Sequence, residues 1–83
     1  MKVTVKYFAS IRERIGTGSE SLDTTAATLG ALRDELIARG GAHAESLARG
    51  RAVRMALNQV MSEEGAPLSD GCEVAFFPPV TGG

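Results

Sequence analysis

The stretch CEVAFFPP, residues 72–79, decides the fold, because it combines a strand pattern with an abrupt end. Side chains of a β-strand point alternately to its two faces, so Phe76 and Phe77 cannot both fill the same core. Pro78 and Pro79 have no amide hydrogen and a fixed φ, which ends the pairing of a central strand. The pattern predicts a last strand that begins at the quoted cysteine and ends at Phe77, with Phe77 at least partly exposed.

The opening stretch KVTVKYF, residues 2–8, alternates in the same way and predicts a half-buried first strand. These two segments hold every aromatic residue of the chain: Tyr7, Phe8, Phe76 and Phe77. Because large side chains dominate small cores, we expect the two strands to be neighbours at the centre of a sheet. They should run parallel, since the long middle of the chain contains a helix and provides a crossover.

The middle of the chain supplies the remaining elements. We expect a short helix over 9–16, a strand over 19–24, the main helix over 28–41, a helical turn over 43–49, a strand over 53–57 and a return strand over 60–61. Thr28 suits the N-cap of the main helix, which should end at Gly40-Gly41 after Arg39 in its last turn. The expected fold class is therefore α+β: a β-grasp (ubiquitin-like) mixed sheet of four to five strands, with one main helix across it.

Composition limits the classes of function. The 83 residues suit a single domain, and 43% of them are hydrophobic, which is typical of a globular chain. A net charge of -1 argues against nucleic-acid binding. Cys72 is the only cysteine, which excludes an internal disulfide and a cysteine-rich metal site. The sequence shows no membrane span and no signal peptide, so the expected compartment is the cytoplasm.

Three stretches carry a resemblance: KVTVKYFASIRERIG (2–16), ALNQ (56–59) and DGCEVAFFPPVTGG (70–83). They are similar to the small subunits of molybdopterin synthase, which are sulfur carriers of the ubiquitin-like superfamily, and the resemblance covers essentially the whole chain. The segment FFPPVTGG is the specific part, because a lone pair of glycines is common at loose ends. Cys72 departs from the family pattern, in which aspartate is more usual.

The resemblance implies a carrier that is not an enzyme on its own. A ubiquitin-activating-like adenylyltransferase would use ATP and magnesium to adenylate the C-terminal carboxylate of Gly83, and a persulfide donor would convert it to a thiocarboxylate. The large catalytic subunit of molybdopterin synthase, in a heterotetramer, would then transfer the sulfur to cyclic pyranopterin monophosphate. The chain itself is expected to bind no cofactor, no metal, no nucleic acid and no membrane.

The domain is expected over residues 1–77, with an extended tail over residues 78–83 that reaches about 20 Å. Two prolines stiffen the start of the tail, and two glycines without Cβ atoms allow its tip to enter a narrow channel. Besides Gly83, the residues expected in such a channel of the partner are Pro78, Pro79, Val80, Thr81 and Gly82.

Docking is expected to use Phe77 as an anchor, with Met61 extending the apolar surface and Arg12 as a polar contact at its rim. Each residue has a plainer interpretation. A loop could cover Phe77, Met61 could fill the core, and an arginine in a short helix is usually just solvated. His43 is expected on the surface of a polar loop, and the run Arg33-Asp34-Glu35 on a solvated helix face.

Three other functions remain open at the level of sequence. The first is a thiocarboxylate carrier for thiazole synthesis or tRNA thiolation, which the full FFPPVTGG ending disfavours. The second is a ubiquitin-like modifier whose Gly83 is joined to lysines of target proteins. The third is an interaction module with an inert tail, which leaves the twin prolines unexplained.

Overall fold

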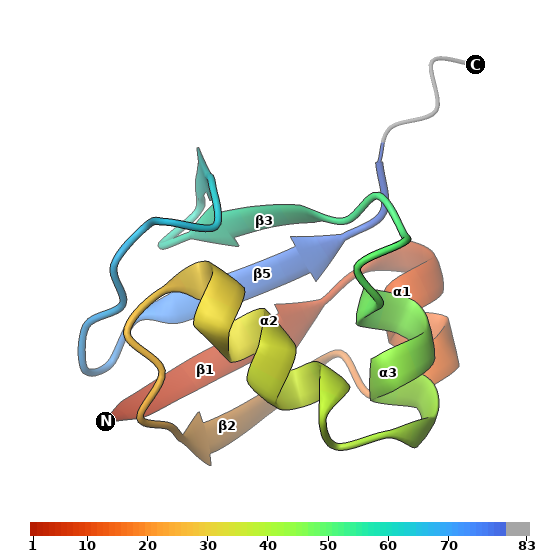
Figure 1. Cartoon of the computed structure of the whole chain (residues 1–83), viewed down its shortest axis with the longest axis horizontal. Coiled ribbons are helices and arrows are strands. Elements are labelled where there is room, and N and C mark those ends of the chain that lie inside the picture. The colour runs from red at the N-terminus through yellow and green to blue at the C-terminus, as the bar shows by residue number, and fades with distance from the viewer. Residues whose placement is uncertain (80–83) are drawn as a thin grey trace.

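The structure, a computed structural model, describes residues 1–79 and consists of a five-stranded sheet with three helices (Figure 1). In chain order the elements are β1 (Lys2–Tyr7), α1 (Ala9–Ile15), β2 (Ser19–Asp23), α2 (Leu29–Ile37), α3 (Gly41–Leu47), β3 (Arg54–Leu57), β4 (Val60–Ser62) and β5 (Glu73–Phe77). The strand order is β2-β1-β5-β3-β4. The first and last strands are therefore neighbours at the centre, as the sequence predicts.

β1 and β5 pair in parallel, with Val5 opposite Val74 and Tyr7 opposite Phe76. The other three pairings of the sheet are antiparallel. The mixed sheet confirms the α+β, β-grasp expectation. Parallel pairing also brings the C-terminal end of β5 beside the start of α1, so the chain leaves the sheet at that edge (Figure 1).

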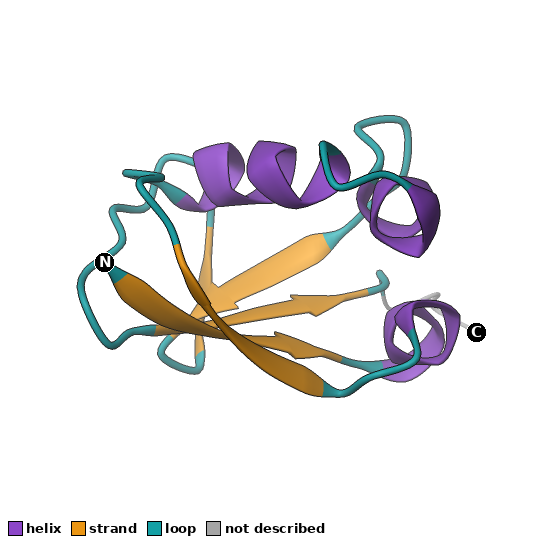
Figure 2. Ribbon diagram, turned by 90° about the horizontal axis from the view of Figure 1, so that it is seen from below, coloured by secondary structure: helices purple, strands orange, loops and turns teal. Residues whose placement is uncertain are grey.

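All three helices lie on one side of the sheet or at its end, and α2 runs across the covered face (Figure 2). The core between them contains mainly aliphatic side chains with two aromatic rings: Val3, Val5, Tyr7, Ile11, Leu29, Leu32, Leu36, Leu47, Met55, Val74 and Phe76. Cys72 is buried in the same core. Among residues 1–79, no helix is long and apolar enough to cross a membrane.

Helix α2 begins where the sequence predicts but ends earlier. Thr28 caps it, because the threonine hydroxyl oxygen accepts a hydrogen bond from the Ala31 amide at 3.2 Å. The last helical residue is Ile37, so the expectation that Arg39 lies in the last turn is wrong. Gly40 turns the chain with a φ of 76°, and α3 then starts at the next residue.

The hairpin between β3 and β4 explains the ALNQ stretch. Asn58 and Gln59 both have positive φ, 50° and 68°, as the two-residue turns that favour asparagine require. The Asn58 side-chain oxygen also accepts a hydrogen bond from the backbone amide of Glu73 at 2.9 Å. The backbone amide of Asn58 donates to the backbone carbonyl of Glu73 at 2.8 Å. Asn58 thus connects the hairpin to the start of β5.

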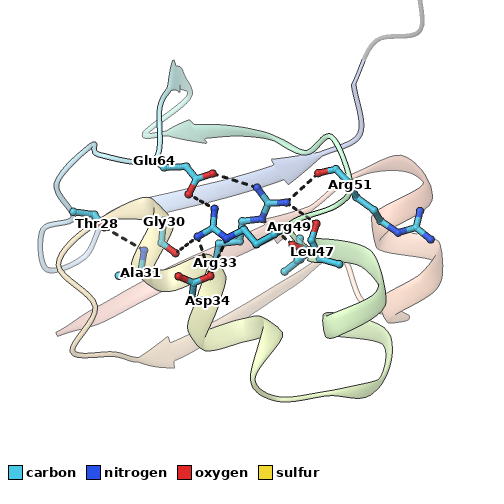
Figure 3. Close-up of polar contacts among 10 residues, drawn as sticks. Thr28, Gly30, Ala31, Arg33, Asp34, Leu47, Arg49, Arg51 and Glu64 are labelled. Carbon is cyan, nitrogen blue, oxygen red and sulfur yellow. Dashed lines mark hydrogen bonds and ion pairs between the residues drawn. The ribbon is translucent and has the colours of Figure 1, made fainter.

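Arg33 contradicts the expectation of a solvated helix face, because only 4% of the residue is exposed. Its guanidinium donates hydrogen bonds to the carbonyl oxygens of Leu47 at 2.8 Å, Ala48 at 2.8 Å and Arg51 at 3.1 Å (Figure 3). A charged donor with three backbone acceptors satisfies the rule that buried polar groups need partners. Arg33 therefore fixes the segment between α3 and β3 onto α2.

Arg49 and Glu64 complete this contact network. Arg49 donates to the Asp34 carboxylate at 2.9 Å, to the Gly30 carbonyl at 3.1 Å and to Glu64 (Figure 3). Glu64 also lies beside Arg33, 3.4 Å from its guanidinium. The loop after β4 therefore packs closely on the first turn of α2, where Gly30 leaves room for it.

Candidate docking face and tail base

Among residues 1–79 no helix covers the second face of the sheet (Figure 2). Residues opposite each other on paired strands share a face, so the register places Phe77 beside Arg54, and Ala75 beside Ala56, on this open side. Met61 lies opposite Ala56 and joins the same row. At the middle of this face Ala56 and Ala75 are themselves buried, at 5% and 6% exposure, whereas Met61 is exposed and Phe77 is half-buried.

Phe77 is half-buried, as the alternation of the last strand predicts. Its ring packs edge-to-face against Phe8, with 5.9 Å between the ring centroids. Phe8 is 45% exposed and Met61 is 49% exposed, so the possibility that Met61 fills the core is excluded. We define the open-face patch as Phe8, Ala56, Met61, Ala75 and Phe77.

Phe8 is an aromatic member of the patch that the sequence analysis assigned to no surface. It follows the last residue of β1 and serves as the N-cap position of α1 with an extended backbone. Of the four aromatic residues, Tyr7 and Phe76 are in the core, and Phe8 and Phe77 are on the other face. The Phe8 backbone continues the extended conformation of β1, so its ring lies on the face opposite Tyr7.

Polar side chains border the open-face patch. Lys6 and Glu73 form an ion pair of 3.7 Å on the same face. Arg12 is exposed on α1, and its guanidinium lies beside Gly18, where a Cβ atom would come within 3.2 Å of its Nε. Within residues 1–79 Arg12 forms no ion pair. Its role as a docking contact stays a prediction.

The tail base consists of Pro78, which is half-buried, and Pro79, which is exposed. The strand ends at Phe77, directly before the two prolines. The other residues expected in the partner's channel, together with the expected reactive residue, lie outside the described residues: Val80, Thr81, Gly82 and Gly83. The described chain leaves the sheet at the end of β5, between the start of α1 and the segment before β3.

A cluster of titratable side chains lies on the covered face at the edge of the sheet formed by β2. The Glu20 carboxylate accepts hydrogen bonds from the Tyr7 hydroxyl at 2.7 Å and from Arg39 at 2.8 Å, and it lies 3.1 Å from Nε2 of His43. His43 therefore lies in α3 against Tyr7 and Glu20, which corrects its assignment to a polar loop. The spacing along the sequence gave no sign of this contact, which joins three elements.

Electrostatics explain why this cluster is structural. Burial alone would raise the pKa of Glu20, but hydrogen bonds from Tyr7, Arg39 and His43 overcome it and lower that pKa to about 2. Burial, followed by the hydrogen bond to Glu20, raises the pKa of Tyr7 well above its ordinary value. Glu20 therefore stays charged and Tyr7 neutral at neutral pH, and the ion pair with Arg39 satisfies the carboxylate. Neither group is poised to exchange a proton.

Comparison with known proteins identifies the family. The ThiS family model matches residues 5–83. The chain belongs to the ThiS family. It is also 41% identical, over 81 residues, to the molybdopterin synthase sulfur carrier subunit of Escherichia coli K12, covering 98% of this chain and 99% of that protein. The protein of the same name from Mycobacterium tuberculosis H37Rv is 36% identical over 85 residues, covering 100% and 99%. The resemblance inferred from sequence is thereby confirmed.

Two solved structures share the whole fold of this chain. SAMP1 from Haloferax volcanii superposes with a TM-score of 0.78 at 28% identity, covering all of both chains. A chain from the complex of subunits 1 and 2 of molybdopterin-converting factor of Helicobacter pylori gives 0.69 at 28% identity, again over all of both chains. The β-grasp assignment rests on these neighbours as well as on the strand order.

Proposed function

We propose that this ThiS-family chain is the sulfur carrier of a molybdopterin synthase, with the carboxyl group of Gly83 as the site that carries sulfur. The observation that supports this most strongly is full-length similarity to relatives named molybdopterin synthase sulfur carrier subunit, at 36% to 41% identity. The fold offers a tail base at the end of a central strand and an apolar face beside it. A carrier needs both features, and it needs no catalytic residues of its own.

In the proposed cycle, an adenylyltransferase that binds ATP and magnesium activates the tail. A carboxylate oxygen of Gly83 attacks the α-phosphorus of ATP, and pyrophosphate leaves. A persulfide sulfur then attacks the acyl carbon and AMP departs. A thiol of the donor protein cleaves the resulting sulfur–sulfur bond, which yields the thiocarboxylate on the carrier and a disulfide on the donor.

The partner in the next step is the large subunit of molybdopterin synthase. A related chain has been solved in a complex of subunits 1 and 2 of molybdopterin-converting factor, which supports a partner of this kind. We place the open-face patch at that interface, with Phe77 and Phe8 as the aromatic anchors. Residues 78–83 would then enter the partner, where the thiocarboxylate gives its sulfur to cyclic pyranopterin monophosphate.

Mass spectrometry of the intact protein tests the chemistry. The chain is incubated with an adenylyltransferase, ATP, magnesium and a persulfide donor, and fragmentation locates any change. We expect the mass gain of one sulfur replacing one oxygen, confined to Gly83. A chain that lacks Gly83 is the control and should gain nothing. An unmodified terminus on the complete chain would contradict the proposal.

A second variant separates charging from transfer. Phe77→Asp should acquire the thiocarboxylate but lose at least tenfold in product formation with the large subunit, because a charge replaces an aromatic anchor. Normal product formation by this variant would show that docking uses another surface. If the variant also failed to acquire the thiocarboxylate, the adenylyltransferase would have to bind the same face.

One neighbour favours a second candidate function. A structure of H. volcanii small archaeal modifier protein 1 superposes with a TM-score of 0.76 at 25% identity. The modifier function shares the adenylated intermediate but ends with an amide between Gly83 and a lysine of another protein. Peptides that carry the C-terminal tail on lysine, in digests of cells that express the charged carrier, would support it.

A further inference from the structure

An open pocket of about 220 Å³ lies at the tail base and shares no residue with the open-face patch. Ile11 and Val53 form part of its apolar wall, together with the tail-base proline Pro78. Arg14 from α1 and Arg51 from the segment before β3 also line it. Any protein that takes up residues 80–83 has to surround the tail base and therefore approaches this pocket.

The arginine side chains at this end of the molecule form no ion pairs among the residues that the structure describes. Within residues 1–79 no ion pair involves Arg12, Arg14, Arg51 or Arg54. The carboxylates next to the pocket in sequence, Glu13 and Glu45, are exposed and do not line it. Arg33, Arg39 and Arg49, by contrast, all contact carboxylates. The pocket is therefore a basic site whose charge is not neutralised by the described part of the chain.

Ser46 supplies an independent sign that the pocket is incomplete. It lines the pocket, it is 2% exposed, and its hydroxyl has no hydrogen-bond partner among residues 1–79. A buried hydroxyl without a partner costs free energy, so such groups are rare in native structures. A hydrogen-bond acceptor that enters the pocket would satisfy it, directly or through one bound water.

We propose that this pocket binds the carboxylate of an aspartate or glutamate side chain of the protein that takes up the tail. The two arginines would pair with the carboxylate, and the Ser46 hydroxyl would donate to it, while the apolar wall accepts the methylene groups of the side chain. An apolar wall gives no advantage to a bare inorganic anion. This proposal rests on the proposed function, in which that protein is the large subunit of molybdopterin synthase.

The contact network around Arg33 holds the pocket in shape. Arg33 donates hydrogen bonds to the carbonyl oxygens of Leu47 and Arg51. Arg51 lines the pocket, and Leu47 directly follows the pocket residue Ser46. The segment that carries Arg51 is thereby fixed before any partner binds. A pre-formed site loses less entropy on binding than a loop that must first be ordered.

Calorimetric titration of the large subunit into the full chain tests the proposal. Arg14→Gln and Arg51→Gln should each raise the Kd about tenfold, because each removes one partner of a charge pair. Ser46→Ala should raise it about fivefold while leaving the free chain as stable as before or more so, since the unpaired hydroxyl is gone. Lys2→Gln, which removes one charge at the other end of the molecule, is the control and should bind like the wild type.

The outcomes separate the two proposals. If the wild type binds and the three pocket variants bind equally well, the pocket proposal is overturned and the proposed function stands. If the wild type itself does not bind the large subunit, the proposed function fails, and the pocket proposal fails with it. Magnetic resonance of the isolated chain adds a third arm: if inorganic phosphate shifts the Ser46 and Arg51 signals but the variants bind normally, the site serves free anions instead.

A double-mutant cycle then identifies the acidic residue. Each aspartate and glutamate of the large subunit is changed to its amide in turn, in combination with Arg51→Gln. One of these changes should remove the sensitivity to Arg51→Gln, because the two side chains would be direct partners. Additive effects for every acidic residue would contradict a carboxylate in the pocket.

Discussion

Two neighbouring phenylalanines lie on opposite faces of the sheet and differ in burial. Phe76 is fully buried under the helices and stacks on Tyr7, with 6.3 Å between the ring centroids. Phe77, the next residue, lies on the open face against Phe8. One ring completes a core, and the other completes a surface that no element among residues 1–79 covers. The covered face therefore contains the core, whereas Phe8 and Phe77 on the other face are partly exposed and serve as the docking anchors in the proposed function.

Truncation of the two phenylalanines should have the largest and most unequal effects. Phe76→Ala should lower the free energy of unfolding by about 3 to 5 kcal/mol, because it leaves a cavity in the core. Phe77→Ala should lower it by less than about 1 kcal/mol and instead weaken binding of the large subunit at least tenfold. Urea denaturation and calorimetry measure the two quantities.

Equal losses of stability from the two substitutions would break the comparison. In that case Phe77 would be part of the core, as in the interpretation in which a loop covers it. Phe8→Ala sharpens the result, because it removes the ring that packs on Phe77 without changing the sheet. Its effects on stability and binding should resemble those of Phe77→Ala.

Arg33 should give the next largest effect, because the layer that covers the sheet depends on it. Arg33→Met keeps much of the side-chain volume but leaves the carbonyl oxygens of Leu47 and Ala48 without their donor. We expect a loss of about 3 kcal/mol in the free energy of unfolding, measured by urea denaturation. Arg39→Met is the matched control in the same region; it removes an exposed ion pair and should cost less than about 1 kcal/mol.

The sequence predicts the strands of this fold well, because alternation and twin prolines are local signals. The order of the central strands follows from where the aromatic residues are, and this inference is confirmed. Arg33 could not be placed in the same way. Its partners are backbone carbonyls 14 to 18 residues away. Because every residue has a backbone carbonyl, the residue types at those positions do not indicate the contact.

The candidate site was predicted only where a side chain alternates within a strand. That rule placed Phe77, whereas the sequence left Met61 open between the surface and the core until the structure showed it exposed. Alternation continued to Phe8 would also place that ring opposite Tyr7, on the open face where it lies. The rule says nothing of Arg14 and Arg51, which line one pocket although α1 and the segment before β3 are far apart in the sequence. His43 was missed because its contact with Glu20 joins a helix to an edge strand.

The Glu20 cluster should make the covered face sensitive to acid. Because its pKa is lowered in the folded state, Glu20 contributes stability that is fully present above its ordinary pKa of 4.5 and is lost as the pH falls to about 2. Glu20→Gln should therefore cost about 1 to 2 kcal/mol at pH 7, where three donors lose a charged acceptor, and much less near pH 2. Denaturation curves across this pH range measure the difference.

Glu45→Gln is the control for this pH dependence, since Glu45 is an exposed residue on α3 without an ion pair among residues 1–79. It should shift stability little at any pH. A difference between wild type and Glu20→Gln that stays constant from pH 7 to pH 2 would contradict the role of the charge. The loss would then come from packing against Tyr7 alone.

Gly30 offers the smallest effect and the sharpest test of how tightly the covered side is packed. At a solvent-exposed position inside a helix, replacing glycine by alanine stabilises the folded state by roughly 1 kcal/mol. At Gly30 a Cβ atom would lie 3.1 Å from the Cβ and 3.3 Å from the carbonyl oxygen of Glu64, so the loop after β4 would have to move. We therefore expect Gly30→Ala to destabilise by about 1 kcal/mol in thermal or urea denaturation. Gly65→Ala, in the same loop with no atom near the added Cβ, should be neutral or slightly stabilising. If Gly30→Ala proved stabilising, the loop after β4 would move away at little cost in free energy. The Arg49–Glu64 contact would then not hold this loop rigidly against α2.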